Sequence, residues 1–393
     1  MRTKKYIAAS GALAAALTLA GCGGGGEPAA ESSSPSPEIK VGEPVVATYD
    51  GGILVIDGES LEVKADIPME GFLRVNPAGD DAHVLVSTNE GFQALDAAGG
   101  QLTGTTFAAE EPGHVVPHGE RTVLFADGSG EITVFDPHEL ANGTPKVDTT
   151  KAPEPHHGVA VVLSDGTQLR SEGNEDTRSG AVALGADGRE IARSAECPGI
   201  HGEAVVAGET ALFGCENGVL AFADGRFTKI ASAGEYGRVG TIKAHAESTV
   251  GLGDFKVDPE AELERPEQFS LIDTDANQLK VVRLPASVSY SWRSLARGPH
   301  AEALILGTDG NLYVIDPNTG ATVKTIAVTE KWNEPEDWQQ PRPAVFARGH
   351  DVYVTESASQ ELHLVDIEAG EVSKSVTLEQ TFNEISGAVG HEH

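Results

Sequence analysis

A short apolar segment that ends in aspartate recurs along the chain and constrains its fold more than any other feature. Clear copies span residues 52–57, 130–136 and 310–316. Weaker copies end at Asp96, Asp187, Asp224, Asp273 and Asp366. The spacing of these copies lies in the range expected for the blades of a β-propeller. Repetition of one supersecondary unit, rather than a set of unrelated elements, is therefore predicted.

Each copy sits in a context typical of a β-hairpin. Most copies follow another strand and a tight Asp-Gly turn, as at residues 127–128 and 309–310, where the turn needs a positive φ angle. A polar turn then leads to a further strand, as at residues 321–326. Four short antiparallel strands repeated around a circle leave few exposed sheet edges. The sequence therefore predicts an all-β protein, an eight-bladed β-propeller over residues 41–393, with seven blades as the alternative if one weak copy is a loop.

The first repeat, which begins near Pro44, lacks a segment for its innermost strand. Residues 383–389, near the end of the chain, have the character of such a strand. We expect this C-terminal strand to close the ring. The repeats lack the Gly-His and Trp-Asp pairs of WD40 proteins and are more similar to the divergent propellers of quinoproteins and bacterial surface proteins.

The first residues resemble an export signal. A short positive region precedes an apolar stretch at residues 6–20 that is too short to span a bilayer. It ends in Leu-Ala-Gly-Cys at residues 19–22, which resembles the lipobox of bacterial lipoproteins and implies lipid on Cys22. We expect a signal peptide at 1–21, a flexible tether rich in Gly, Ser, Pro and Glu at 22–40, and a body outside the cytoplasm that is anchored to the cell membrane. An ordinary secretory signal is the alternative.

Charge and cysteine content narrow the possible functions. The formal net charge of −32 excludes the basic surface that nucleic-acid binding requires. Apart from Cys22, the chain contains only Cys197 and Cys215. In an oxidising compartment a disulfide between them is expected. Two thiolate metal ligands are the alternative, although the spacing matches no common zinc module.

Three histidine-containing phrases fall just before, or at the start of, the predicted inner strands of blades three, four and five. They span residues 112–120, 155–159 and 198–203. Equivalent positions of neighbouring blades lie side by side around the central channel of a propeller. Imidazoles at these positions could therefore converge on one ion near the channel mouth.

His157 and His201 are the candidates from blades four and five, and blade three offers two histidines. The phase of its strand favours His114, whereas the match of His118-Gly119-Glu120 to the phrase at His201 favours His118. Glycine follows His118, His157 and His201 and permits close backbone approach. Secondary candidates are His156, beside His157, and the terminal pair His391 and His393.

Imidazole suits Zn²⁺ because it binds as a neutral base at physiological pH. Three histidines leave a fourth position for a carboxylate, a water molecule or a ligand from another protein. Copper and nickel are also accepted by imidazole. Hydrogen-bonded structural histidines are the alternative, and His391 and His393 could form either a metal-collecting arm or a disordered tail. The remaining histidines, among them His300 and His350, are dispersed and expected to be structural.

The phrases at residues 157–161 and 197–204, together with Cys215 and the three residues after it, resemble the AztD family of zinc metallochaperones. The resemblance implies a β-propeller that holds zinc outside the cytoplasm and passes it to AztC, the solute-binding protein of a zinc ABC transporter. It implies His114 or His118, His157 and His201 as ligands, and Cys197 with Cys215 as a family disulfide. Family members in Gram-negative bacteria are soluble in the periplasm and can carry a His-rich N-terminal segment, which this tether lacks.

A zinc-binding chaperone without catalytic activity is therefore the favoured hypothesis. A propeller enzyme, metal- or quinone-dependent, is one alternative. Against it, Trp292, Trp332 and Trp338 form no cofactor-docking pattern, and neither paired catalytic carboxylates nor a nucleophile motif can be recognised. The hypothesis of a zinc hydrolase is still open, because catalytic zinc also commonly has three protein ligands. A surface scaffold that binds protein or glycan is the other alternative.

Overall fold

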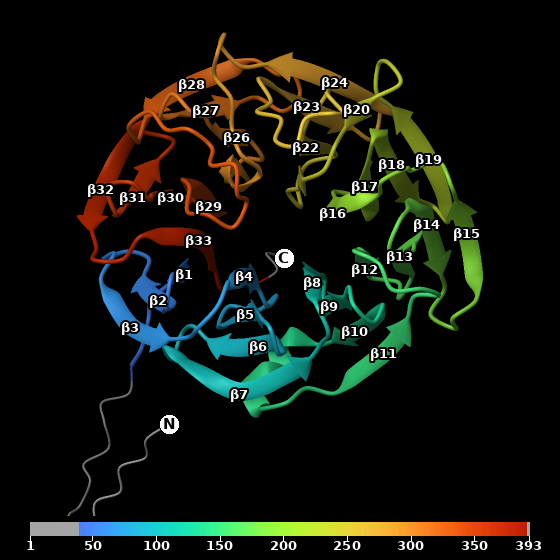
Figure 1. The fold of residues 1–393 in the computed structure, drawn as a ribbon, viewed down its shortest axis with the longest axis horizontal. Helices are drawn as coiled ribbons and strands as arrows, with labels where there is room; N and C mark the ends of the chain where they lie inside the picture. The colour runs from blue at the N-terminus through green and yellow to red at the C-terminus, as the bar shows by residue number, and fades with distance from the viewer. Residues whose placement is uncertain (1–38, 391–393) are drawn as a thin grey trace, which may run out of the picture. The chain divides into compact units, whose positions relative to one another are not determined.

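The apolar segments of the repeat each form the third strand of a four-stranded antiparallel blade, counted outward from the central axis (Figure 1). The computed structural model describes residues 39–390, and within this range eight such sheets surround the axis. The eight-bladed, all-β prediction is therefore confirmed. Among the described residues, no helix has the length and apolar character needed to cross a membrane.

The strands of the first four blades are given from the axis outward. Blade 1 contains β33 (Phe382–Gly387), β1 (Pro44–Tyr49), β2 (Gly52–Asp57) and β3 (Val63–Pro68). Blade 2 contains β4 (Arg74–Pro77), β5 (His83–Thr88), β6 (Gly91–Asp96) and β7 (Gln101–Ala108). Blade 3 contains β8 (Pro112–His118), β9 (Arg121–Ala126), β10 (Glu131–Phe135) and β11 (Val147–Lys151), with the 3-10 helix η1 (Pro137–Asn142) before β11. Blade 4 contains β12 (Ala160–Val162), β13 (Gln168–Gly173), β14 (Arg178–Leu184) and β15 (Glu190–Ser194).

The other four blades follow the same order. Blade 5 contains β16 (His201–Val206), β17 (Thr210–Cys215), β18 (Asn217–Ala223) and β19 (Arg226–Ala231), and the short β20 (Gly237–Arg238) pairs with β18. Blade 6 contains β21 (Ile242–Lys243), β22 (Val250–Asp254), β23 (Gln268–Asp273) and β24 (Gln278–Arg283). Blade 7 contains β25 (Leu295–Arg297), β26 (Ala303–Leu306), β27 (Asn311–Ile315) and β28 (Thr322–Ala327), preceded by η2 (Trp292–Ser294). Blade 8 contains β29 (Ala344–Arg348), β30 (Asp351–Glu356), β31 (Glu361–Asp366) and β32 (Glu371–Thr377).

The composition of a strand follows its depth in the blade. The middle strands are buried at almost every position, as in β2, because a blade packs against a neighbour on each of its faces. Continuous short apolar runs are typical of strands buried on both sides. The outermost strands are largely exposed, and Val323 of β28 is 60% exposed.

The two ends of the propeller sequence meet in blade 1. The C-terminal strand β33 pairs antiparallel with β1, and Val46 lies opposite Ser386. Phe382, at the start of β33, is fully buried. The prediction that a C-terminal strand closes the ring is therefore confirmed, with the strand one residue earlier at its start than expected.

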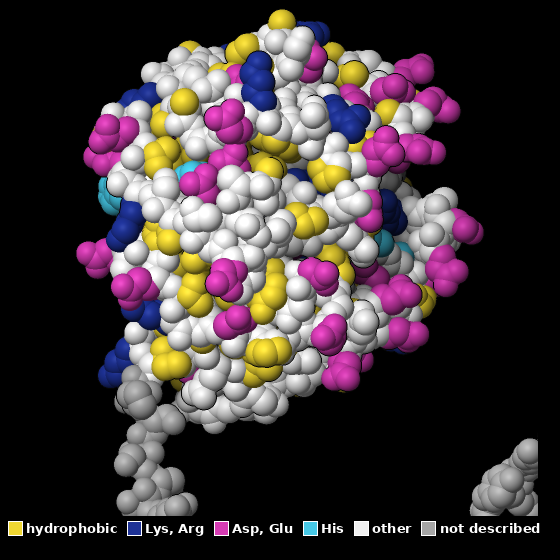
Figure 2. All heavy atoms as spheres, turned by 60° about the vertical axis from the view of Figure 1, so that its left-hand side comes forward, with side chains coloured by type: hydrophobic (Ala, Val, Ile, Leu, Met, Phe, Trp, Pro, Cys, Tyr) yellow, Lys and Arg dark blue, Asp and Glu magenta, His cyan; other side chains and the backbone are white. Residues whose placement is uncertain are grey.

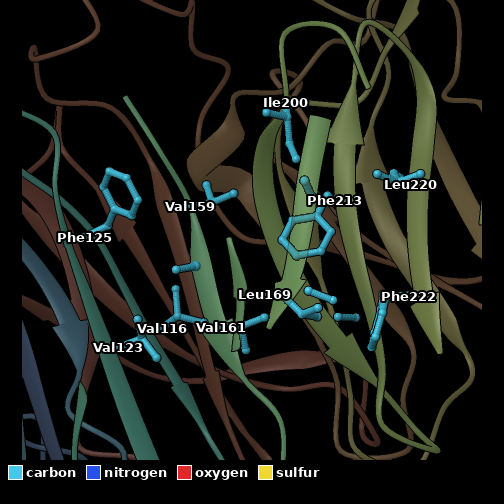
Figure 3. Packing of buried hydrophobic residues seen from close by; sticks show 14 of the residues in the cluster. Val116, Val123, Phe125, Val159, Val161, Leu169, Ile200, Phe213, Leu220 and Phe222 are labelled. Atoms are coloured by element: carbon cyan, nitrogen blue, oxygen red, sulfur yellow. The ribbon is translucent and has the colours of Figure 1, made fainter. Parts of the chain in front are cut away.

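Blades 3, 4 and 5, which carry the histidine phrases, share one apolar cluster (Figure 3). Each buried Val, Leu or Phe side chain in such a cluster contributes about 1.5–3 kcal/mol. The ten side chains labelled in Figure 3 come from all three blades and are Val116, Val123, Phe125, Val159, Val161, Leu169, Ile200, Phe213, Leu220 and Phe222. This packing fixes the positions of the three blades relative to one another.

Cys197 and Cys215 form a disulfide bond with a sequence separation of 18. Both residues are fully buried. The bond joins the loop that enters β16 to the end of β17, and closing a loop of this size stabilises a fold by about 3 kcal/mol in the chain-entropy model. The expected disulfide is confirmed, and the alternative of two thiolate metal ligands is wrong.

The antiparallel order gives the propeller two distinct faces. The innermost strands all begin on one face, which we call the entry face; it carries the starts of β12 and β16 and the turn at residues 127–130. The first hairpin turn of each blade lies on the opposite face, which we call the exit face. Examples are the turns at residues 119–120 of blade 3 and 207–209 of blade 5. Equivalent turns of neighbouring blades are therefore adjacent on the same face.

Candidate metal centre

Three histidines from three adjacent blades meet on the entry face. His114 lies in β8, His157 precedes β12, and His201 is the first residue of β16. One ring nitrogen from each lies within 4.8 Å of the other two. The ring centroids of His157 and His201 are 4.9 Å apart, and that of His114 is 5.4 Å from His157 and 5.1 Å from His201. The sequence-based expectation that imidazoles of blades 3, 4 and 5 converge thus agrees with the geometry.

Glycines beside two of these histidines allow the close approach. Gly202 has a φ angle of +65°, in a bulge of β16, and a Cβ there would collide with the carbonyl oxygen of Gly240. A Cβ on Gly158 would collide with the ring of Phe125 in the neighbouring blade. Replacing Gly202 would therefore displace the backbone beside His201, and replacing Gly158 would displace either its own backbone or the Phe125 ring.

The Nδ1 atom of His201 carries a proton in the neutral ring. It lies 2.6 Å from the carbonyl oxygen of Gly240, which can only accept a hydrogen bond. The Nε2 atom of His201 is then a lone-pair nitrogen, and it lies 2.9 Å from Nε2 of His157.

The other two histidines also donate from Nδ1 to an acceptor outside the cluster. His114 donates to Glu203 Oε1 at 3.0 Å, and His157 donates to Asp127 Oδ2 at 2.5 Å. Such acceptors fix the orientation of metal-binding imidazoles and raise their basicity. All three rings therefore keep Nε2 available on the side of the cluster.

The cluster is enclosed by protein but reachable from solvent. The His157 side chain is 46% exposed, whereas those of His114 and Glu203 are much less so. Glu203 Oε2 is buried without a hydrogen-bond partner in the described part of the chain. The centre thus has an open side at His157 and a buried carboxylate oxygen whose bonding capacity is unused.

The environments of His114 and His201 shift their pKa values in opposite directions. Burial lowers the pKa of His114, but the charge and hydrogen bond of Glu203 outweigh it and raise the pKa above 6.5. Burial, together with the neighbouring His114 and His157, holds the pKa of His201 well below 6.5. Of these two residues, His114 is therefore the one that holds a second ring proton more readily, and His201 stays a neutral base.

The arrangement fits a tetrahedral zinc ion. With Zn–N bonds of about 2.0–2.1 Å, two ligand nitrogens lie roughly 3.3 Å apart. The Nε2 atoms of His157 and His201, at 2.9 Å, need to separate by only a few tenths of an ångström. Three imidazoles would leave one position for a water molecule or a ligand from another molecule.

The structure does not bring His118 to this cluster. His118 ends β8 on the exit face, where its Nε2 lies 3.0 Å from Glu209 Oε1. Four residues of extended strand separate it from His114 by roughly 13 Å. Of the two histidines that the sequence left open in blade 3, His114 is the one that lies with His157 and His201.

The secondary candidates lie elsewhere. His156 is buried; its Nδ1 donates to the carbonyl oxygen of Glu154 at 2.9 Å, and its Nε2 lies 2.8 Å from Ser171 Oγ. Both nitrogens therefore have structural partners. His391 and His393 lie outside the described residues.

Sequence reasoning missed the acceptors behind the imidazoles. Glu203 follows His201 by two residues, within a phrase in which only the histidine has a recognisable metal-binding role. Asp127 is the first residue of an Asp-Gly pair, which indicates only a turn. The carbonyl of Gly240 has no side-chain signal in the sequence.

The sequence is similar to that of a curated protein with a stated function. The protein described as "Zinc chaperone AztD" from Citrobacter koseri is 24% identical over 309 residues, which cover 76% of this chain and 72% of the relative. No protein-family model matches the chain.

Solved structures agree with the fold. The structure of apo AztD from Citrobacter koseri superposes with a TM-score of 0.76 at 19% identity and covers 89% of this chain and 98% of that one. A second crystal structure of Citrobacter koseri AztD gives a TM-score of 0.74 at 20% identity, with the same coverage of both chains. The similarity extends over nearly the whole described propeller.

The opposite pKa shifts predict two separate titrations in protein without added metal. We expect His114 to keep its ring proton above pH 6.5 and His201 to stay neutral below it, for the electrostatic reasons given above. Below pH 6.5, protonated His114 contributes to the free energy of unfolding, and this contribution is lost as the pH rises through its raised pKa. Above pH 6.5, neutral His201 contributes to the free energy of unfolding, and this contribution is lost as the pH falls towards its lowered pKa. Ring NMR signals recorded against pH measure both, and Glu203→Gln should lower the pKa of His114. Titration of both rings together near pH 6.5 would contradict the assignment.

Proposed function

We propose that the chain, which is similar to the zinc chaperone AztD along most of its length, is an extracytoplasmic zinc metallochaperone of the AztD family. In this proposal His114, His157 and His201 hold Zn²⁺ as cargo, and the protein passes it to the solute-binding protein of a zinc ABC transporter. The observation that carries the proposal is the convergence of three imidazoles, each with Nδ1 hydrogen-bonded to an acceptor outside the cluster.

The same geometry favours a carrier over a permanent metal site. Structural zinc sites are closed by four protein ligands, whereas this centre offers three imidazoles and an exposed edge at His157. Ligand exchange needs an entering group to reach the metal before the departing group leaves. An accessible fourth position supplies that route for a donor atom of an acceptor protein.

A binding role rather than catalysis is supported by the similarity to a protein named as a zinc chaperone. Two tryptophans considered for cofactor docking have structural contacts. Trp292 packs against the guanidinium groups of Arg74 and Arg293, and Trp332 donates from Nε1 to the carbonyl oxygen of Gly307. These contacts account for both rings without a cofactor.

Zinc binding is tested by metal analysis of the full chain purified without an affinity tag. We expect one tightly bound zinc ion at the entry face, and we expect the double variant His157→Ala/His201→Ala to lose it. Loss of two ligands should weaken binding by more than the roughly 10–100-fold that removal of an outer hydrogen-bond partner causes. Equilibrium dialysis against a competing chelator measures the change.

A matched control is His118→Ala. His118 lies in β8, the inner strand that also carries His114, but at its exit-face end. This variant should retain the tight zinc ion. Equal loss of the tight zinc ion in the His118→Ala control, or tight zinc binding by the double variant, would contradict the assignment of the ligands.

Delivery to a transporter component is a separate part of the proposal, and it is supported by the name of the related protein and by the accessible edge of the site. The zinc-loaded protein is mixed with the metal-free solute-binding protein of a zinc ABC transporter from the same organism. Direct transfer should give a rate that rises with acceptor concentration and exceeds spontaneous zinc dissociation. A rate equal to dissociation at every acceptor concentration would argue for release into solution instead.

The proposed location is outside the cytoplasm, with a signal peptide at residues 1–21, lipid on Cys22 and a tether at 22–40. The buried disulfide fits an oxidising compartment. Residues 1–38 lie outside the described range, so the support for the anchor is the sequence pattern. Cys22→Ser should move the protein from the membrane fraction to the soluble fraction of cells; an unchanged distribution would argue against lipidation.

A further inference from the structure

We propose a second divalent-metal site, formed by His300, His350 and Glu368 on the exit face. His300 lies in the first hairpin turn of blade 7, His350 in the first turn of blade 8, and Glu368 in the last turn of blade 8. The antiparallel order places all three turns on the face opposite the cluster at His201. One potential ligand atom from each residue lies within 4.8 Å of the other two.

The spacing of these atoms allows long hydrogen bonds or ion pairs, and it also matches the spacing of ligands on one metal ion. Oε1 of Glu368 lies 3.3 Å from His300 Nε2 and 3.4 Å from His350 Nδ1. Charge-assisted N–H···O bonds are shorter, about 2.7–2.9 Å. Two donors on one tetrahedral zinc ion lie roughly 3.3 Å apart. The ring centroids of His300 and His350 are 5.6 Å apart, so both imidazoles face the same carboxylate.

Side-chain hydrogen bonds to carbonyl oxygens hold the backbone of two of these turns. The guanidinium of Arg297, itself buried, donates to the carbonyl oxygen of Ala301 at 2.6 Å, which fixes the turn that carries His300. Lys324 donates from Nζ to the carbonyl oxygen of Ile367 at 2.7 Å, beside Glu368. The side chains of His300 and Glu368 thus project from turns whose main chain is held by hydrogen bonds.

A repeated phrase precedes both histidines. Ala-Arg-Gly occupies residues 296–298 before His300 and residues 347–349 before His350. Like the phrases of blades 3 to 5, it places a histidine at a similar point of consecutive blades. This repetition is the sequence signal that sets His300 and His350 apart from the other dispersed histidines.

Two imidazoles and one carboxylate form a donor set that suits Zn²⁺ and other divalent metals of intermediate softness. The side chains of His300, His350 and Glu368 are 63%, 69% and 63% exposed. The metal would therefore keep water ligands and exchange readily, and binding should be weaker than at the enclosed entry-face cluster. The net charge of −32 raises the local concentration of cations around the whole molecule.

Zinc titration of the full chain tests this site. The tag-free protein carries His391→Ala/His393→Ala throughout, so that the terminal histidines contribute nothing. Equilibrium dialysis with metal analysis should give two zinc ions per chain, one tight and one weaker. Adding His300→Ala/His350→Ala should remove the weaker ion and leave the tight one unchanged. Ring NMR signals of His300 and His350 should shift only as the second ion binds.

Two controls separate this inference from the proposed function. His138→Ala removes one exposed histidine elsewhere on the surface and should leave both zinc ions bound. His157→Ala/His201→Ala should remove the tight ion and keep the weaker one. A parent protein that binds no second ion, or a second ion that persists in His300→Ala/His350→Ala, would overturn the inference whatever happens at the entry face.

Discussion

The face-to-face packing of neighbouring blades is the constraint on which the rest of the molecule depends. Each blade buries the middle strands of its sheet on both sides, so every inner strand lies beside the inner strands of two neighbours (Figure 1). Residues at equivalent depth in consecutive blades are consequently adjacent in space, although more than forty positions separate His157 from His201 in the chain. Ring closure by β33 extends this arrangement to blade 1, where β1 would otherwise leave an unpaired edge.

Packing of the blades brings the three imidazoles together, and hydrogen bonds to their Nδ1 atoms determine which ring nitrogen is left for a metal ion. Glu203, Asp127 and the carbonyl oxygen of Gly240 each accept a hydrogen bond from one Nδ1–H group, which leaves the Nε2 atoms facing a shared space. Three imidazoles this close disfavour a second positive charge, and the lowered pKa of His201 reflects that repulsion as well as burial. A divalent cation would satisfy all the lone pairs at once. The chain is acidic, with 60 Asp and Glu residues against 28 Lys and Arg, and on the face shown in Figure 2 the acidic side chains are spread widely.

Much of the candidate site could be predicted because equivalent positions of consecutive repeats lie side by side in a propeller. The phrases around His157 and His201 precede inner strands in the same way, and the structure brings both residues together. The choice between His114 and His118 stayed open, since strand phase and local motif gave opposite answers. An extended strand settles it by placing the two residues at opposite ends, roughly 13 Å apart. Asp127 could not be predicted as a partner of His157, because an aspartate before glycine is explained by a turn alone.

The sequence by itself predicted the all-β blade architecture and the closing strand, and it favoured eight repeats and a disulfide between the two body cysteines. These depend on local patterns, namely apolar runs, turn residues and residue counts. Only the tertiary structure decided which blade 3 histidine joins the cluster, which acceptors hold each Nδ1, and that His300 and His350 share one carboxylate. Such contacts depend on the angles and distances between separate blades, which long-range packing sets and no local pattern encodes.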